Sequence, residues 1–315
     1  MVIAGYNTNL NYGDSLANSR GTDIPRGIGL INSHGQYILA VASTNSAFDK
    51  TYWRAAITDG TNNYWGSGGI TGTYYFGFDE PAAVVQNLFV NSRAMGLYNG
   101  NIYCAEASNP NGILEIDGMP TNPTTSTNYL FAGSSGTSDM AVSPDGNLIY
   151  VADQRGTSSG GGVQRWDFDT DSSTWNLTYT LTDGYGSKGP RYVAVDFSGA
   201  NPVVYVTTDD NTLDNNRIVR TEDTGAGSTG VTLAYAGVNE TFRGIHFGPV
   251  ESALIVTPPT LYFTKDGTNL ILNWSGSFFL QSATNVTGPY SDVSDATNPY
   301  TNSISGGQLF FRLRN

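Results

Sequence analysis

Four arginines and one aspartate occupy matching places in the sequence, and their residue types are those that could bind an anion. Each precedes a short apolar run that is typical of a β-strand. Successive members are 39, 46, 52 and 52 residues apart. A guanidinium presents planar, paired donors that suit a carboxylate, sulfate or phosphate. The five residues are Arg54, Arg93, Asp139, Arg191 and Arg243.

Two interpretations of this set are open. If the apolar runs are equivalent strands, the residues gather a formal charge of +3 at one end of the fold, where they could bind an anionic ligand. Alternatively, the arginines pair with Asp139 and with backbone carbonyls and simply fill a central channel. The predicted direction of each side chain depends on which residue is aligned, because a shift of one residue turns a side chain to the opposite face of its strand.

Three carboxylates are candidates for general acid or base catalysis. Glu106, Asp139 and Asp153 stand at the ends of apolar runs. Glycoside hydrolysis needs two carboxyl groups about 5 Å apart or about 6.5–9.5 Å apart, depending on the stereochemistry. The histidines are weaker candidates, because His34 falls in a turn and His246 falls on the strand face opposite Arg243.

A repeated β-architecture is needed to bring these residues together. Residues 138–181 predict four short strands separated by turn residues, and the Pro144-Asp145-Gly146 turn predicts a hairpin. The same order recurs at 55–88, 94–131 and 192–235. Four strands in each repeat of about 40–50 residues indicate the blades of a β-propeller.

The ends of the predicted ring supply a fifth blade. We expect a strand at 243–247 to be innermost in this blade and to pair with strands at 2–6, 27–31 and 37–42. Such closure would leave no exposed sheet edge. The sequence therefore predicts an all-β fold with a propeller of five four-stranded blades, or part of a six-bladed parent.

The pattern changes near residue 250. Thr257-Pro258-Pro259-Thr260 is typical of a linker, and short apolar runs follow it. We expect a β-propeller over 1–250, a linker over 251–259 and a small β-sandwich module over 260–315.

Composition excludes several classes of protein. The chain carries 15 Lys+Arg against 27 Asp+Glu, a net charge of −12, which argues against nucleic-acid binding. Its one cysteine cannot form an internal disulfide. No apolar run is long enough to span a membrane as a helix. Abundant aromatic, Gly, Ser, Thr and Asn residues favour a secreted or cell-surface protein, which we expect to be a monomer.

Oxygen-rich loops raise the question of a metal ion. Asp167, Asp169 and Asp171 alternate as in part of a calcium loop, but the Gly and the final Glu of that motif are absent. These carboxylates either bind a structural Ca²⁺ or are simply solvated, and we expect no other cofactor.

Two stretches carry a resemblance to known proteins. Residues 280–290 (LQSATNVTGPY) and 310–314 (FFRLR) resemble a C-terminal module of secreted bacterial proteins. In those proteins the module follows diverse extracellular domains, many of which take part in polysaccharide breakdown. Residues 153–155, 160–166, 223–228 and 242–244 are similar to uncharacterised secreted bacterial β-propellers, often with longer N-terminal halves. The resemblance implies a fold and a location but no catalytic residues.

These observations lead to three hypotheses. The first is a secreted propeller that binds a small-molecule or glycan anion, such as an acidic glycan, through Arg54, Arg93, Arg191 and Arg243. The second is a hydrolase acting on an anionic glycoside or ester, with Asp139, Asp153 or Glu106 as acid or base. The third is a purely structural surface protein.

Overall fold

The computed structural model divides the chain into two compact units, Met1–Pro249 and Val250–Asn315. It describes residues 1–9, 13–77, 83–87, 91–108, 110–209, 216–249, 261–274, 278–304 and 306–314. The predicted linker, 251–259, lies outside the described residues. Within these ranges, no helix is long and apolar enough to cross a membrane.

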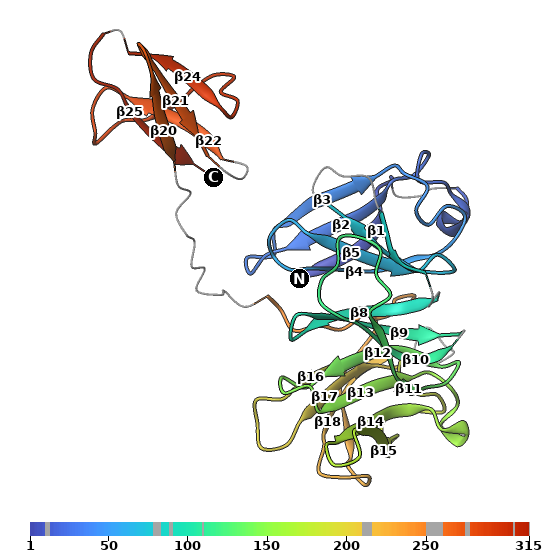
Figure 1. The fold of residues 1–315 in the computed structure, drawn as a ribbon. Coiled ribbons are helices and arrows are strands. Elements are labelled where there is room, and N and C mark those ends of the chain that lie inside the picture. Colours follow the sequence, from blue (N-terminus) through green and yellow to red (C-terminus); the bar gives the residue numbers. More distant parts are fainter. Residues whose placement is uncertain are drawn as a thin grey trace. The chain divides into compact units, whose positions relative to one another are not determined.

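The first unit is built from successive antiparallel sheets, which follow one another in chain order in Figure 1. The first sheet has three strands, β1 (Val2–Tyr6), β2 (Arg26–Ile31) and β3 (Tyr37–Ser43). Four four-stranded sheets follow, in which the strand order equals the chain order. Their strands are β4 (Trp53–Thr58), β5 (Tyr64–Gly68), β6 (Thr73–Phe76) and β7 (Ala83–Gln86); β8 (Ser92–Tyr98), β9 (Asn101–Ala107), β10 (Asn111–Ile116) and β11 (Thr127–Ala132); β12 (Thr137–Val142), β13 (Leu148–Asp153), β14 (Gly162–Asp169) and β15 (Thr174–Leu181); and β16 (Tyr192–Asp196), β17 (Val203–Thr207), β18 (Arg217–Glu222) and β19 (Gly230–Tyr235).

The first strands of the sheets pack side by side. β1 contacts β4, β4 contacts β8, β8 contacts β12, and β12 contacts β16. Sheets arranged radially by their first strands are the defining feature of a propeller. The predicted all-β, propeller-type fold is confirmed.

The structure corrects the prediction that a strand at 243–247 closes the ring. Residues 241–249 contain no strand, and β1 pairs only with β2, so the first sheet has three strands among the described residues. Gly244 has a φ of 74°, a left-handed conformation that interrupts an extended backbone. The segment lies beside the last sheet instead, where the Phe247 ring meets the Tyr205 ring at 5.7 Å. The predicted pairing of this segment with β1 is therefore wrong.

Local hydrogen bonds explain the predicted hairpin between β12 and β13. The Ser143 hydroxyl donates to Asp145 Oδ1 at 2.5 Å, and the Asn147 N–H donates to the same oxygen at 3.2 Å. Gly146 adopts a φ of 76°, which the turn requires and which glycine adopts without steric cost. The turn thus fixes the pairing of β12, which precedes it, with β13, which follows it.

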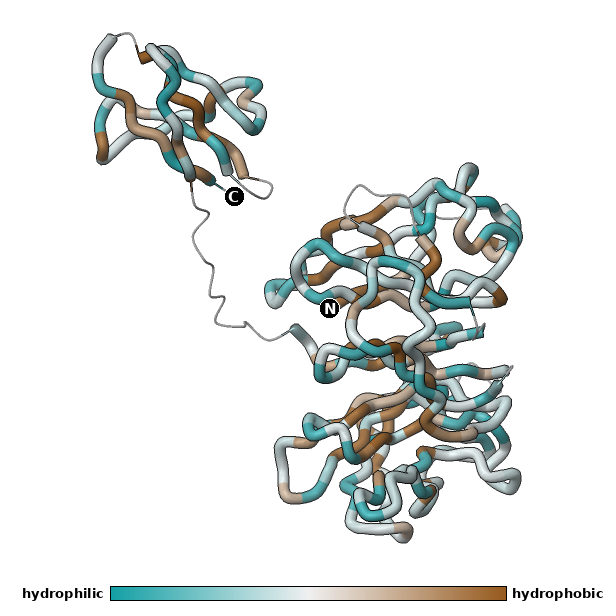
Figure 2. The backbone as a smooth tube through the Cα atoms, viewed as in Figure 1, coloured by the Kyte–Doolittle hydropathy of each residue, from teal (hydrophilic) through white to brown (hydrophobic). Residues whose placement is uncertain are grey.

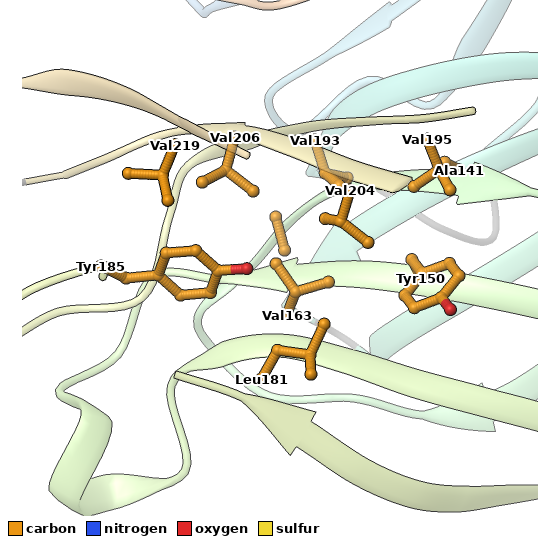
Figure 3. Close-up of a cluster of buried hydrophobic side chains, with 11 residues drawn as sticks. Ala141, Tyr150, Val163, Leu181, Tyr185, Val193, Val195, Val204, Val206 and Val219 are labelled. Carbon is orange, nitrogen blue, oxygen red and sulfur yellow. The ribbon is translucent and has the colours of Figure 1, made fainter. Parts of the chain in front are cut away.

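Apolar side chains between neighbouring sheets form the core. In Figure 3, Val193, Val204, Val206 and Val219 of the last sheet face Val163, Leu181 and Tyr150 of the preceding sheet. Figure 2 shows hydrophobic colour concentrated along the strands rather than in the loops. Fully burying one such valine stabilises the fold by roughly 1.5–3 kcal/mol.

The second unit is a small β-sandwich. One sheet has the order β20-β21-β24 and the other β23-β22-β25, and Leu272, Trp274 and Leu280 are buried in it. Its strands are β20 (Tyr262–Asp266), β21 (Asn269–Asn273), β22 (Phe279–Ala283), β23 (Ser291–Asp292), β24 (Tyr300–Ser303) and β25 (Phe310–Arg314).

Candidate functional site

Irregularities in strand pairing place the residues of the site. In β4 the register shifts between Trp53 and Ala55, so that Arg54 is the extra residue of a β-bulge. Arg93 holds the same place in β8, and Ser138 holds it in β12. Arg191 directly precedes β16. Because a bulge re-aims its extra side chain, equivalent positions in four successive sheets can point to one place.

These four residues line one cavity of about 580 Å³. Among the described residues, three cationic side chains and no carboxylate line it. The lining residues are Tyr52, Trp53, Arg54, Arg93, Ser138, Gln154, Arg191 and Tyr192.

Protein groups hold two of the three guanidinium groups in place. Arg54 Nη1 donates to Asn91 Oδ1 at 2.5 Å, and its guanidinium lies 4.6 Å from the Tyr52 ring centroid. Arg191 Nε donates to Gln154 Oε1 at 3.2 Å, and its Nη2 lies 3.4 Å from Asp209 Oδ1. Both arginines are therefore oriented before any ligand arrives.

Arg93 differs from its neighbours because the described part of the chain gives its guanidinium no hydrogen bond or ion pair. Its Nη1 atom is buried and has no acceptor. Burial lowers the pKa of Arg93, and the positive charges of Arg54 and Arg191 lower it further, against a weaker opposite effect of Asp153 and Asp209. The protein thus holds a cation here at a cost in free energy.

Asp139 was expected beside the arginines, and its placement is a correction. The bulge puts Ser138 in the cavity, and Asp139 lines a second cavity of about 320 Å³ with Tyr98 and His246. Its carboxylate accepts the backbone N–H groups of Met140 at 2.9 Å and Val193 at 3.0 Å. Burial raises the pKa of Asp139 to about 7, although both hydrogen bonds act in the opposite direction. The sequence alignment was one residue off in this sheet.

The other two carboxylates also lie outside the lining of the arginine cavity. Glu106 is fully buried on β9 and accepts a hydrogen bond from the Ser92 hydroxyl. Burial raises its pKa to about 7, although the Ser92 bond and the Arg54 charge oppose the rise. Asp153 is bound by Arg155 Nη2 at 2.7 Å and by Ser134 Oγ at 2.7 Å. Asp153 therefore acts as an anchor for the loop after β13.

Arg243 and both histidines lie away from the arginine cavity. Arg243 is exposed in the segment without strands and does not line the cavity. His34 is exposed in a turn, as expected. His246 is exposed, and its Nδ1 lies 2.9 Å from the Phe247 carbonyl oxygen. The structure thus brings three of the four predicted arginines together.

The described residues contain no group of three or more His, Cys, Asp or Glu side chains placed to hold a metal ion. Asp167 is held by Arg165 Nη2 at 2.9 Å, and Asp169 accepts the Ser172 hydroxyl at 2.8 Å. Residues 210–215, which include two further aspartates and two asparagines, lie outside the described residues.

Sequence reasoning missed five residues that line the cavity. Tyr52, Trp53 and Tyr192 adjoin arginines that were singled out, so their proximity was a usable signal. Ser138 was missed because nothing local reveals a bulge. Gln154 follows β13 directly, and only the paired register shows that this strand end faces the start of β12.

Comparisons with known proteins give a likeness of structure only. No family model matches the chain, and no curated protein matches it either. Similar solved structures include TolB from Acinetobacter baumannii, at 11% identity over 88% of this chain and 61% of that chain, with a TM-score of 0.48. The chain therefore spans less than two thirds of the length of TolB.

Two further structures show likeness at the same level. The GH43 endo-arabinanase from Bacillus licheniformis matches at 12% identity over 82% of this chain and 92% of that chain, with a TM-score of 0.38. A puromycin-hydrolyzing peptidase from Mycobacterium tuberculosis matches at 10% identity over 96% of this chain and 55% of that chain, with a TM-score of 0.42. At these values, none of them assigns a ligand or an activity to this chain.

Proposed function

We propose that the first unit binds an anionic ligand in the cavity lined by Arg54, Arg93 and Arg191, and that the ligand is an acidic glycan of the protein's extracellular surroundings. Three guanidinium groups in one cavity favour oxyanions, for which arginine supplies paired donors. The aromatic rings of Tyr52 and Tyr192 also line the cavity, and Tyr52 is 56% exposed. Their faces would suit the apolar face of a sugar ring.

The unpaired guanidinium of Arg93 carries the proposal. If the arginines served only to fill a channel, each would be expected to pair with a carboxylate or a carbonyl, because an unpaired buried charge is costly. Arg54 and Arg191 have such partners, whereas Arg93 has none among the described residues. A bound oxyanion would supply the missing acceptors.

The hydrolase alternative has less support from the same geometry. Asp139, Asp153 and Glu106 do not line the cavity with the arginines. Asp139 and Asp153 already accept hydrogen bonds from protein donors through both carboxylate oxygens. We therefore propose binding rather than catalysis.

Isothermal titration calorimetry on the full chain tests the proposal. The probes are D-glucuronate and polygalacturonate, with D-glucose as the neutral counterpart, at low ionic strength. We expect both anions to bind and glucose not to bind. Arg93→Met, which keeps an unbranched apolar stem, should weaken anion binding at least about tenfold, the effect of losing one charged hydrogen-bonded contact.

A matched control is Arg220→Met. Arg220 lies on β18, does not line the cavity, and its Nη2 is 3.6 Å from Glu222. This variant should bind the anions as the unmodified chain does. Absence of binding by every anion, or equal losses in both variants, would refute the proposed function.

A further inference from the structure

The charge balance of the cavity indicates which class of anion it prefers. Resting on the proposed function, we infer that the cavity selects a ligand with two negative charges close together over a ligand with one. The three arginines bring a charge of +3, and Asp209, paired with Arg191 at 3.4 Å, offsets one. Counting the described residues that line the cavity and the one carboxylate that forms an ion pair with them, a charge of +2 is left for the ligand.

The arrangement of the arginines supports the same conclusion. The charges of both Arg54 and Arg191 act on Arg93, so one guanidinium experiences repulsion from two neighbours. A singly charged ligand would offset only part of this repulsion. A doubly charged ligand bound at Arg93 would offset both contributions.

Positions of the donors also favour two oxyanion groups or one large group. Arg54 Nη1 and Arg191 Nε are already used by Asn91 and Gln154, so each residue offers only its remaining N–H groups to a ligand. Arg93 offers its whole guanidinium. Donors from three sheets converge on one space, which fits an oxyanion with several acceptor atoms.

Two chemical sources could supply two charges in one cavity. A phosphate monoester is close to doubly ionised at neutral pH, because its second pKa is near 6. Two neighbouring uronate carboxylates of an acidic disaccharide would supply the same total charge. A sulfate monoester and a single uronate carry only one charge and serve as matched monoanions.

Calorimetric titration of the full chain with four probes tests the inference. These are glucose 6-phosphate against glucose 6-sulfate, and digalacturonate against galacturonate, at pH 7.5 and constant ionic strength. We expect the dianion to bind at least about tenfold more tightly than its monoanion partner in one of the two pairs. The pair that shows this preference identifies the source of the charge.

A charge variant provides a second measurement. Arg93→Met lowers the remaining charge from +2 to +1, so the preference for the dianion should shrink by several fold, whereas Arg220→Met should keep it. Equal affinities within both pairs, or a preference unchanged by Arg93→Met, would overturn the inference while leaving anion binding intact. If none of the four probes binds, the inference and the proposed function fail together.

Discussion

The carboxylate of Asp139 accepts the backbone N–H of Val193 at 3.0 Å, and this bond joins β12 of one sheet to β16 of the next. The bond is partly buried between the sheets, so the ionised form of Asp139 is poorly solvated. Burial accordingly raises its pKa to about 7. Glu106 is in a similar state on β9, where burial also raises its pKa to about 7.

These two groups predict how stability depends on pH. A carboxyl whose pKa is higher in the folded chain than in the unfolded chain stabilises the fold at low pH, and this contribution is lost as the pH rises from about 4 to about 7. Asp139→Asn removes one such group. The fall in the free energy of unfolding between pH 5 and pH 7.5, measured by urea denaturation, should therefore be smaller in Asp139→Asn than in the unmodified chain.

An exposed loop carboxylate supplies the control for this measurement. Asp171→Asn, in the turn between β14 and β15, should leave the pH dependence unchanged. The same slope in Asp139→Asn and in the unmodified chain would contradict the account of Asp139.

A second prediction concerns a buried network between the last two sheets. Asp223 accepts hydrogen bonds from the hydroxyl groups of Tyr150 and Tyr179, the latter at 2.7 Å, and from Arg165 Nη1 at 3.1 Å. Asp223→Asn leaves Arg165 without this counterion and should cost on the order of 3 kcal/mol of unfolding free energy. Tyr179→Phe removes the bond to Asp223 and a longer one, 3.4 Å, from Arg165 Nη1, but it keeps the Arg165–Asp223 ion pair and should cost only about 1–2 kcal/mol. Urea denaturation of both variants at pH 7 measures the difference, and equal losses would contradict the network.

A third prediction distinguishes the binding residues expected from the sequence pattern from those that line the cavity in the structure. The pattern assigned Arg243 to the binding set, whereas the structure places it in an exposed segment outside the cavity. Arg243→Ala should therefore bind D-glucuronate as the unmodified chain does, while Arg54→Ala should bind it several fold more weakly. Calorimetric titration measures the affinity of both variants. A loss of affinity in Arg243→Ala as large as that in Arg54→Ala would show that Arg243 belongs to the site.

The sequence predicts much of the fold because strand signals are local. Alternating apolar residues and turns such as Pro144-Asp145-Gly146 mark β12 and β13 without any knowledge of distant contacts. The same logic found Arg54 and Arg93, since each precedes a clear apolar run.

The parts that failed depend on distant pairing. Whether Ser138 or Asp139 enters the cavity depends on a bulge, and the bulge is defined only by the register of β12 against β13. Whether residues 242–247 form a strand depends on a partner strand and on the φ of Gly244. The absence of a protein partner for Arg93 within the described chain is likewise a property of the assembled sheets.

The central claim is that Arg93 is held unpaired for a ligand and does not support the fold. The most direct test measures thermal unfolding and D-glucuronate binding together in Arg93→Met. Because the substitution removes a half-buried charge that has no partner among the described residues and is repelled by Arg54 and Arg191, we predict an unchanged or raised Tm together with binding weakened at least about tenfold. A lowered Tm with unchanged binding would contradict the account and assign Arg93 to the structure of the channel.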